Sequence, residues 1–225
     1  MTPQPLILVG GGEHARVVAD AARSTGRWEI VGVADPAVPD GSFAELGIAH
    51  LGDDHALAAT LASAGVDARP WLIVSIGAIV DGAVRRQAVA RFEQEQWASV
   101  VHAAAWVSPS AEVEQGAVVM AGAVVNAGAR IGAHAIVNSG AIIEHDVLVG
   151  AFARIGPRAA VGGGTVIGSD ALIGLGAAVR DHLIVGAGAI VGMGAVVTEP
   201  VAPGATVVGV PARPVTVSRP ARDVS

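Results

Sequence analysis

One histidine of the sequence stands between two carboxylates, in the run Glu144-His145-Asp146. A carboxylate that accepts a hydrogen bond from one ring nitrogen holds an imidazole in one tautomer and makes it more basic near neutral pH. Such an imidazole can take a proton from an amine or a hydroxyl group as that group attacks a thioester. Direct transfer of an acyl group needs no serine or cysteine nucleophile. The run predicts a general base at His145, and a solvated histidine without a catalytic role is the alternative.

A second set of residues is typical of a nucleotide site. The run Gly10-Gly11-Gly12-Glu13-His14-Ala15 follows a short apolar segment and precedes a helical pattern, and Asp35 ends the next apolar segment. Glycines at such a turn let a pyrophosphate approach the N-terminus of the helix, while the acid binds a ribose hydroxyl. The pattern indicates phosphates and a ribose without specifying NAD, and a tight turn without a ligand is the alternative. His14 either binds a substrate oxygen or has no role beyond starting the helix.

The C-terminal half must be a scaffold with a period of six residues. From Val107 to Val197 every sixth residue is valine or isoleucine, and the residue four places later is nearly always alanine. Neither a helix nor a simple strand has this period, whereas a β-solenoid of short strands and corners does. The aliphatic and the small residues both face the narrow interior, and the corners favour types that accept unusual backbone angles. A membrane-spanning helix is excluded because glycine interrupts every apolar run.

The N-terminal part alternates short apolar runs with helical patterns. We expect strands near Leu6–Val9, 30–35, 71–77 and 97–101, with helices over 15–23, 53–64 and 84–96. This order predicts a small parallel sheet, equivalent to half of a dinucleotide-binding fold at most.

Composition limits the class of protein. The 225 residues are 52% hydrophobic but only 3% aromatic, which suits a thin core of small side chains. The net charge of −6 gives no electrostatic footprint for nucleic acid or an anionic membrane. The chain contains no cysteine and begins without the features of a signal peptide, so we expect a cytoplasmic protein.

The remaining histidines of the C-terminal half could be ligands of a metal ion. With three hexapeptides in each coil, His145 and His182 lie on one face two coils apart, while His134 lies on another face and His102 fills a turn. Zinc needs its ligands within about 2 Å of the ion, so a single chain is not expected to bind it. A zinc hydratase-like enzyme with a site between subunits, or a non-catalytic structural trimer, is the alternative of a different class.

The motifs together resemble one family. The hexapeptide repeat, the glycine loop, Asn138, the run Glu144–Asp146 and the closing Gly209-Val210-Pro211-Ala212-Arg213 are similar to the sugar acyltransferases typified by sialic acid O-acetyltransferase and the UDP-4-amino-sugar N-acetyltransferase of bacillosamine synthesis. The resemblance implies an α/β Rossmann-like half-domain followed by an all-β left-handed parallel β-helix. It also implies a homotrimer with active sites between subunits.

The resemblance assigns roles to particular residues. His145 would be the general base, with Asp146 increasing its basicity. The nucleotide sugar would contact a set in the N-terminal half together with residues near the base: Gly12, Glu13, His14, Asp35, Gly77, Asn138 and Glu144. Acetyl-CoA would lie near Leu175 and Met193. Arg154 stands where many relatives have a second histidine, and would contact the thioester oxygen or a CoA phosphate. Glu13 is unusual, because an acid beside a pyrophosphate is unfavourable.

We therefore expect a nucleotide-sugar-binding domain over residues 1–101, a β-helix acyltransferase domain with its tail over 102–215, and disorder over 216–225. The expected reaction is acetyl transfer from acetyl-CoA to the amino group of a nucleotide-linked amino sugar, with O-acetylation of a sugar hydroxyl as the alternative. The expected partners are these two substrates and two further copies of the chain, without nucleic acid, membrane or metal.

Overall fold

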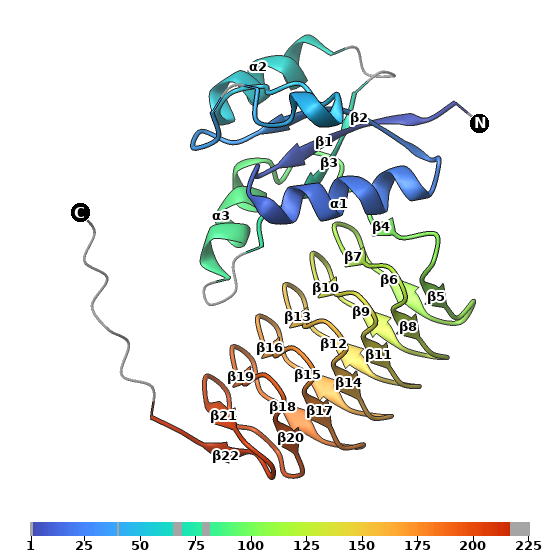
Figure 1. Ribbon diagram of the computed structural model, residues 1–225, viewed down its shortest axis with the longest axis vertical. Helices are drawn as coiled ribbons and strands as arrows, with labels where there is room; N and C mark the ends of the chain where they lie inside the picture. Colours follow the sequence, from blue (N-terminus) through green and yellow to red (C-terminus); the bar gives the residue numbers. More distant parts are fainter. Residues whose placement is uncertain (1, 40, 65–68, 78–81, 217–225) are drawn as a thin grey trace.

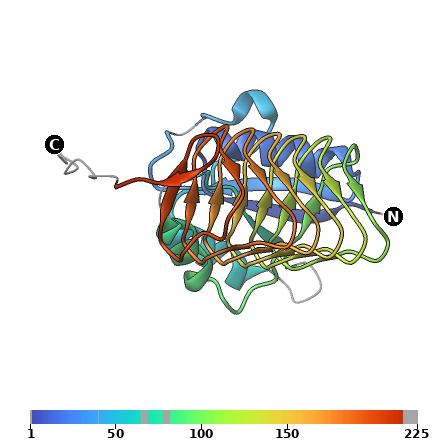
Figure 2. The same ribbon diagram turned by 90° about the horizontal axis from the view of Figure 1, so that it is seen from below.

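The computed structural model describes residues 2–39, 41–64, 69–77 and 82–216. An α/β part lies at one end of a stack of coils, and the chain descends from it through the stack (Figure 1). Seen from below, along the stack, the coils lie in front of the α/β part (Figure 2). Of the segment predicted to be disordered, only Thr216 lies within the described residues. No helix among the described residues is long and apolar enough to cross a membrane.

The N-terminal part is a small parallel sheet with helices on it. Strands β1 (Gln4–Val9), β2 (Trp28–Ala34) and β3 (Trp71–Val74) pair in the order β2-β1-β3. Helices α1 (Glu13–Ser24), α2 (Asp54–Ser63) and α3 (Ala83–Arg91) and the 3-10 turn η1 (Ala44–Leu46) complete it. The carboxyl ends of all three strands meet at one edge, where a parallel sheet of this kind binds its ligands.

The fourth strand expected at 97–101 does not extend this sheet. Trp97 makes one isolated bridge to Leu72, and β4 (Val100–Val101) instead pairs with the first full coil of the solenoid. The helix expected over 84–96 also ends early, at Arg91. The chain leaves the α/β part through this segment and enters the solenoid at β4.

The solenoid has three faces built from strands of two or three residues. The first sheet contains β4, β7 (Val118–Val119), β10 (Ile136–Val137), β13 (Arg154–Ile155), β16 (Leu172–Ile173), β19 (Ile190–Val191), β21 (Thr206–Val208) and the antiparallel β22 (Arg213–Pro214). The second contains β5 (Trp106–Val107), β8 (Val124–Val125), β11 (Ile142–Ile143), β14 (Ala160–Val161), β17 (Ala178–Val179) and β20 (Val196–Val197). The third contains β6 (Glu112–Val113), β9 (Arg130–Ile131), β12 (Leu148–Val149), β15 (Val166–Ile167) and β18 (Ile184–Val185).

The interior of the coils confirms the two predicted inward positions. Ile136 pairs with Arg154 and Ile142 with Ala160, so residues 18 apart stack on each other. Ile143, Ile155 and the alanines four places after an aliphatic position, from Ala117 to Ala195, are fully buried. Burying one such isoleucine stabilises the fold by about 1.5–3 kcal/mol, and the core is one continuous column of these contacts.

The glycines of the repeat serve two separate purposes, and our expectation that the corners need unusual angles explains only one. From Gly116 to Gly194, the third residue after each aliphatic position has a positive φ. Where it is not glycine, it is His134, Asp146, Phe152, Arg158, Asp170 or His182. The glycine directly after the aliphatic residue, as at Gly150, has no positive φ. A Cβ there would lie 2.5 Å from the backbone nitrogen of Ser169, so this glycine is required by the close approach of the next coil.

Candidate active site

His145 and Asp146 form a side-chain pair at the corner between β11 and β12. Nδ1 of His145 lies 3.0 Å from Oδ2 of Asp146, and both side chains are largely exposed. Because an ionised carboxylate only accepts, Nδ1 carries the hydrogen and Nε2 keeps its lone pair. The backbone is fixed by the neighbouring coils, since Asp146 N donates to Ala127 O at 3.0 Å and Gly164 N donates to His145 O at 2.9 Å. The corner therefore presents a proton-accepting nitrogen on a rigid support.

The other residues expected around the base do not surround it within one chain. Glu144 is its half-buried neighbour, but Asn138 lies at a different corner, between β10 and β11. Leu175 and Met193 lie along that same corner in later coils, with 58% and 80% of their surface exposed. One face of the prism thus separates His145 from these three residues.

Arg154 also lies away from the dyad. Its strand, β13, belongs to the first sheet, and only 8% of the residue is exposed. It is near Arg85 of α3, and burial followed by the charge of Arg154 lowers the pKa of the Arg85 guanidinium to about 10. Within one chain, Arg154 therefore belongs to the junction of the two parts.

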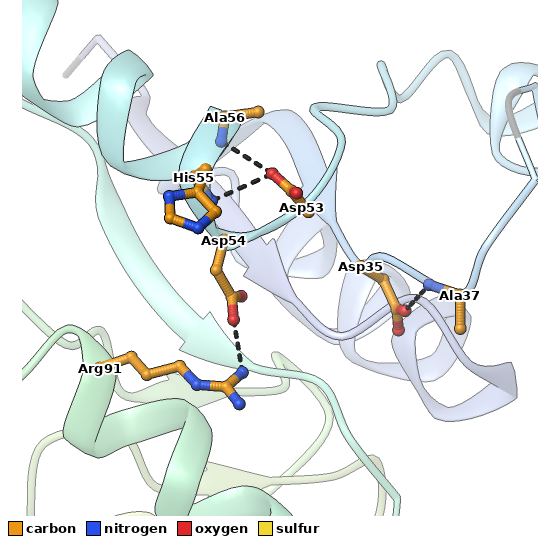
Figure 3. Close-up of polar contacts among 7 residues, drawn as sticks. All are labelled: Asp35, Ala37, Asp53, Asp54, His55, Ala56 and Arg91. Carbon is orange, nitrogen blue, oxygen red and sulfur yellow. Dashed lines mark hydrogen bonds and ion pairs between the residues drawn. The ribbon is translucent and has the colours of Figure 1, made fainter.

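The glycine loop and Asp35 are joined by a hydrogen bond. Gly11 N donates to Oδ2 of Asp35 at 2.7 Å. Ala37 N donates to Oδ1 of Asp35 at 2.8 Å (Figure 3). A Cβ on Gly11 would lie 2.6 Å from Val38, so the loop has no room for a side chain there. Asp35 thus shapes the loop, and each of its oxygens keeps one further lone pair for a ligand hydroxyl.

The N-terminus of α1 has no side-chain cap, whereas the N-terminus of α2 has one. Asp53 caps α2 by accepting from the backbone amides of His55 and Ala56, both at 3.0 Å (Figure 3). Gly12 caps α1 without any side-chain hydrogen bond, and a Cβ on Gly12 would meet nothing within 4 Å. Uncapped amides at a helix N-terminus favour an anion such as a phosphate. Glu13, in the first turn, is exposed and opposes that preference.

His14 and Gly77 lie in contact at the same edge of the sheet. A Cβ on Gly77 would lie 2.7 Å from the Cβ of His14, so glycine is required beside this histidine. His14 Nε2 is buried without a hydrogen-bond partner among the described residues. Burial, and secondly the charge of Arg85, lower the pKa of the His14 imidazole, which stays neutral near pH 7.

The junction between the two parts was not predicted from the sequence. Arg85 is fully buried and donates from Nη2 to the carbonyl oxygen of His134 at 2.6 Å. The His134 ring stacks on Phe152, with centroids 4.9 Å apart, and meets Trp97 edge-on at 5.1 Å. Arg86 and Asp170 add a two-bond ion pair at 2.8 and 2.5 Å. His134, Phe152 and Asp170 are 18 residues apart, and this spacing is the signal that could have identified them as one column.

Acidification is expected to destabilise the fold through His134. Burial, and then the charges of Arg85 and Arg86, lower the pKa of the His134 imidazole to about 4 from an ordinary 6.5. Between pH 6.5 and pH 4 the unfolded chain binds more protons than the folded chain. The stability is therefore complete above pH 6.5, falls progressively down to about pH 4 and changes little below it. The expected loss in the free energy of unfolding at pH 4 is about 2–3 kcal/mol, measured by urea unfolding across this range.

The matched control for this loss is His134→Phe. Phe152 occupies the equivalent position in the next coil with a φ of 61°, against 58° for His134, so a phenyl ring suits this backbone. The variant should keep the ring stack and lose most of the pH dependence. An unchanged dependence would assign the effect to another group, such as His14.

Among the described residues, no group of three or more histidine or carboxylate side chains could hold a metal ion. The rings of His145 and His182 lie beside Gly163 and Gly164, whereas that of His134 lies beside Gly116 at another corner. The predicted distribution of these histidines over two faces is therefore present in the fold.

The comparisons with known proteins agree on one class. The profile of the PglD N-terminal domain matches residues 5–92. The acetyltransferase domain of PglB from Neisseria gonorrhoeae FA1090, solved in complex with acetyl coenzyme A, is 34% identical with a TM-score of 0.84, over 95% of this chain and 100% of that chain. A variant of perosamine N-acetyltransferase from Caulobacter crescentus, solved with CoA and GDP-perosamine, is 33% identical with a TM-score of 0.84, over 95% and 97%.

A third structure, WeeI from Acinetobacter baumannii AYE, is 24% identical with a TM-score of 0.82, over 94% of this chain and 100% of that chain, and supports the fold alone. No curated protein sequence matches the chain. The identity to the two acetyltransferases extends over nearly the full length of all three chains, and so includes both the α/β part and the coils. The chain therefore belongs to the hexapeptide-repeat sugar acetyltransferases, and is an acyltransferase with an N-terminal α/β part and a parallel β-helix.

Proposed function

We propose that the protein transfers the acetyl group of acetyl-CoA to the amino group of a nucleotide-linked amino sugar, with His145 as the general base. The observation that carries this proposal is the contact of His145 Nδ1 with Asp146, which leaves Nε2 as an exposed proton acceptor. Support for the substrate class comes from the perosamine N-acetyltransferase, a 33% identical relative whose structure holds CoA and GDP-perosamine.

The reaction follows from one proton acceptor and one thioester. The acceptor nitrogen forms a bond to the acetyl carbonyl carbon while His145 Nε2 takes a proton from that nitrogen. The carbon–sulfur bond then breaks, and the sulfur of CoA leaves with the electron pair. The imidazolium returns the proton to this sulfur, which regenerates the base. Asp146 stabilises the imidazolium through its hydrogen bond to Nδ1 and keeps the ring oriented.

The N-terminal part would hold the nucleotide. Phosphates would lie against the uncapped amides of α1 at Gly12, and a ribose hydroxyl would donate to Asp35. His14 and Gly77 lie in contact at this edge, and we expect the neutral imidazole of His14 to lie near the sugar. Because Glu13 lies at the same helix start, we expect the phosphates to be held loosely.

Acetyl-CoA would lie between two copies of the chain in a homotrimer. The second and third solenoid faces carry exposed apolar side chains, among them Trp106 at 60%, Ile142 at 40% and Ile184 at 59%. Exposed apolar side chains on two neighbouring faces suit a contact with further copies of the chain. A neighbouring copy would place its corner with Asn138, Leu175 and Met193 against the His145 corner, which completes a site that one chain leaves divided.

Acceptor chemistry is the direct test. Purified protein with acetyl-CoA and a nucleotide 4-amino sugar should release free CoA and form an amide that hydroxylamine leaves intact. The matched acceptor, with a hydroxyl in place of the amine, should give no product. An ester formed from the hydroxyl acceptor, and no amide, would instead establish O-acetylation.

Light scattering of the same preparation should give three times the chain mass of 22.3 kDa, and a monomer would exclude the shared site.

A further inference from the structure

Each residue of the dyad lies against a glycine of a neighbouring coil. The His145 ring lies beside Gly163, which is 18 residues later, and the Asp146 carboxylate lies beside Gly128, which is 18 residues earlier. These glycines are not part of the nucleotide loop or of the expected CoA contacts. Their shared feature is that the space a side chain would fill is occupied by the dyad.

The contact at Gly163 is made by the reactive edge of the imidazole. A Cβ there would lie 2.6 Å from Nε2, 2.7 Å from Cε1 and 3.1 Å from Cδ2 of His145. Real carbon atoms do not approach so closely, so the ring could not keep its place beside an alanine. Since Nδ1 is engaged by Asp146, the displaced atom is the one that accepts the proton.

Backbone conformation does not explain the glycine at 163. The residue has no positive φ, unlike Gly164 beside it, whose φ is 64°. Ala127 occupies the equivalent place two coils earlier, so the corner accepts a methyl group there. What distinguishes position 163 is only the ring above it.

We propose that Gly163 is a positioning residue for His145, because it leaves free the space in which the imidazole can contact Asp146 and expose Nε2. The proposal rests on the general-base role of His145 given above. A side chain at 163 would rotate the ring, lengthen the 3.0 Å contact with Asp146 and cover the proton-accepting nitrogen.

The test is Gly163→Ala, measured by steady-state kinetics and by ¹⁵N NMR of the histidines. We expect kcat to fall by about 10- to 100-fold, because small misplacements of a catalytic group have effects of this size. KM for acetyl-CoA should stay within about two-fold, since no binding contact is removed. The ¹⁵N shifts of His145 should change from a single tautomer with hydrogen on Nδ1 to a mixture.

Gly188→Ala is the matched control. It adds a methyl at a glycine with a φ of 65°, between β18 and β19 and so at a different corner from the dyad, where a Cβ would meet nothing within 4 Å. Its kcat should stay within about two-fold of the unaltered protein. Equal losses of kcat in both variants would show a general response of the coils and overturn the proposal.

A double variant separates positioning from folding. In His145→Ala the ring is gone, so adding Gly163→Ala should change neither the residual rate nor the melting temperature. A further drop in melting temperature in this background would show that Gly163 serves the fold, and would overturn the proposal. If Gly163→Ala keeps full kcat while His145→Ala loses it, only the positioning role fails. If His145→Ala keeps its rate, the proposed function fails first.

Discussion

Replacing His145 with alanine is expected to lower kcat by about 10²- to 10⁴-fold, the range that a positioned general base contributes. The acceptor nitrogen must lose a proton as its bond to the carbonyl carbon forms, and Nε2 of His145 is the exposed acceptor that the dyad provides. KM for acetyl-CoA should change little, because the residues proposed to hold the thioester donor do not include His145. Rates of CoA release at saturating substrates measure the effect.

The matched control is His182→Ala. His182 lies at the same corner as His145 and is also exposed. Its left-handed backbone, with a φ of 53°, matches that of Asp146, with a φ of 57°. Its removal should leave kcat within about three-fold, since its ring lies beside Gly164, whereas the His145 ring lies beside Gly163. If His145→Ala retained nearly the full rate, or if both variants lost it equally, the assignment of the base to His145 would be wrong.

The C-terminal fold could be predicted because its core repeats every six residues. Each inward position is occupied by an aliphatic or a small residue, so the positions of these residues in the sequence identify the whole interior of the coils. The α/β part was harder. Its strands were located within a few residues, but Trp97 to Val101 has the composition of a strand without revealing which sheet it joins. That choice depends on long-range pairing.

The site was predictable where its parts are adjacent in sequence. His145 and Asp146 are neighbours, and the glycine loop lies a fixed distance before Asp35. The contacts made between stacked coils were missed, because nothing in the sequence near Gly163 indicates that this glycine lies beside the His145 ring. The junction was missed for the same reason, since nothing local indicates that Arg85 lies against His134.

Replacing Gly150 with alanine is expected to destabilise the fold by about 3 kcal/mol, the upper part of the range for inserting atoms into a packed interior. The added Cβ would lie 2.5 Å from Ser169 N, 2.8 Å from Gly168 C and 2.9 Å from Ser169 Cα. Backbone atoms cannot move aside as a flexible side chain does, so two coils must separate. Their hydrogen bond from Gly150 N to Ile167 O, at 2.7 Å, would lengthen with them.

Gly188→Ala distinguishes this close approach from the other use of glycine in the repeat. Gly188 has a φ of 65°, and its Cβ would meet nothing within 4 Å. Only the left-handed conformation opposes an alanine there, at about 1 kcal/mol, and His134, Phe152 and Asp170 already hold that conformation in the same column. At about 2–4 °C per kcal/mol for a chain of this size, Gly150→Ala should melt roughly 6–12 °C lower and Gly188→Ala roughly 2–4 °C lower than the unaltered protein. Equal shifts would contradict the expectation that the close approach of the next coil at Gly150 destabilises the fold more than the left-handed backbone at Gly188 does. A larger shift at Gly150 would show that the distance between coils limits which residues can follow the aliphatic position.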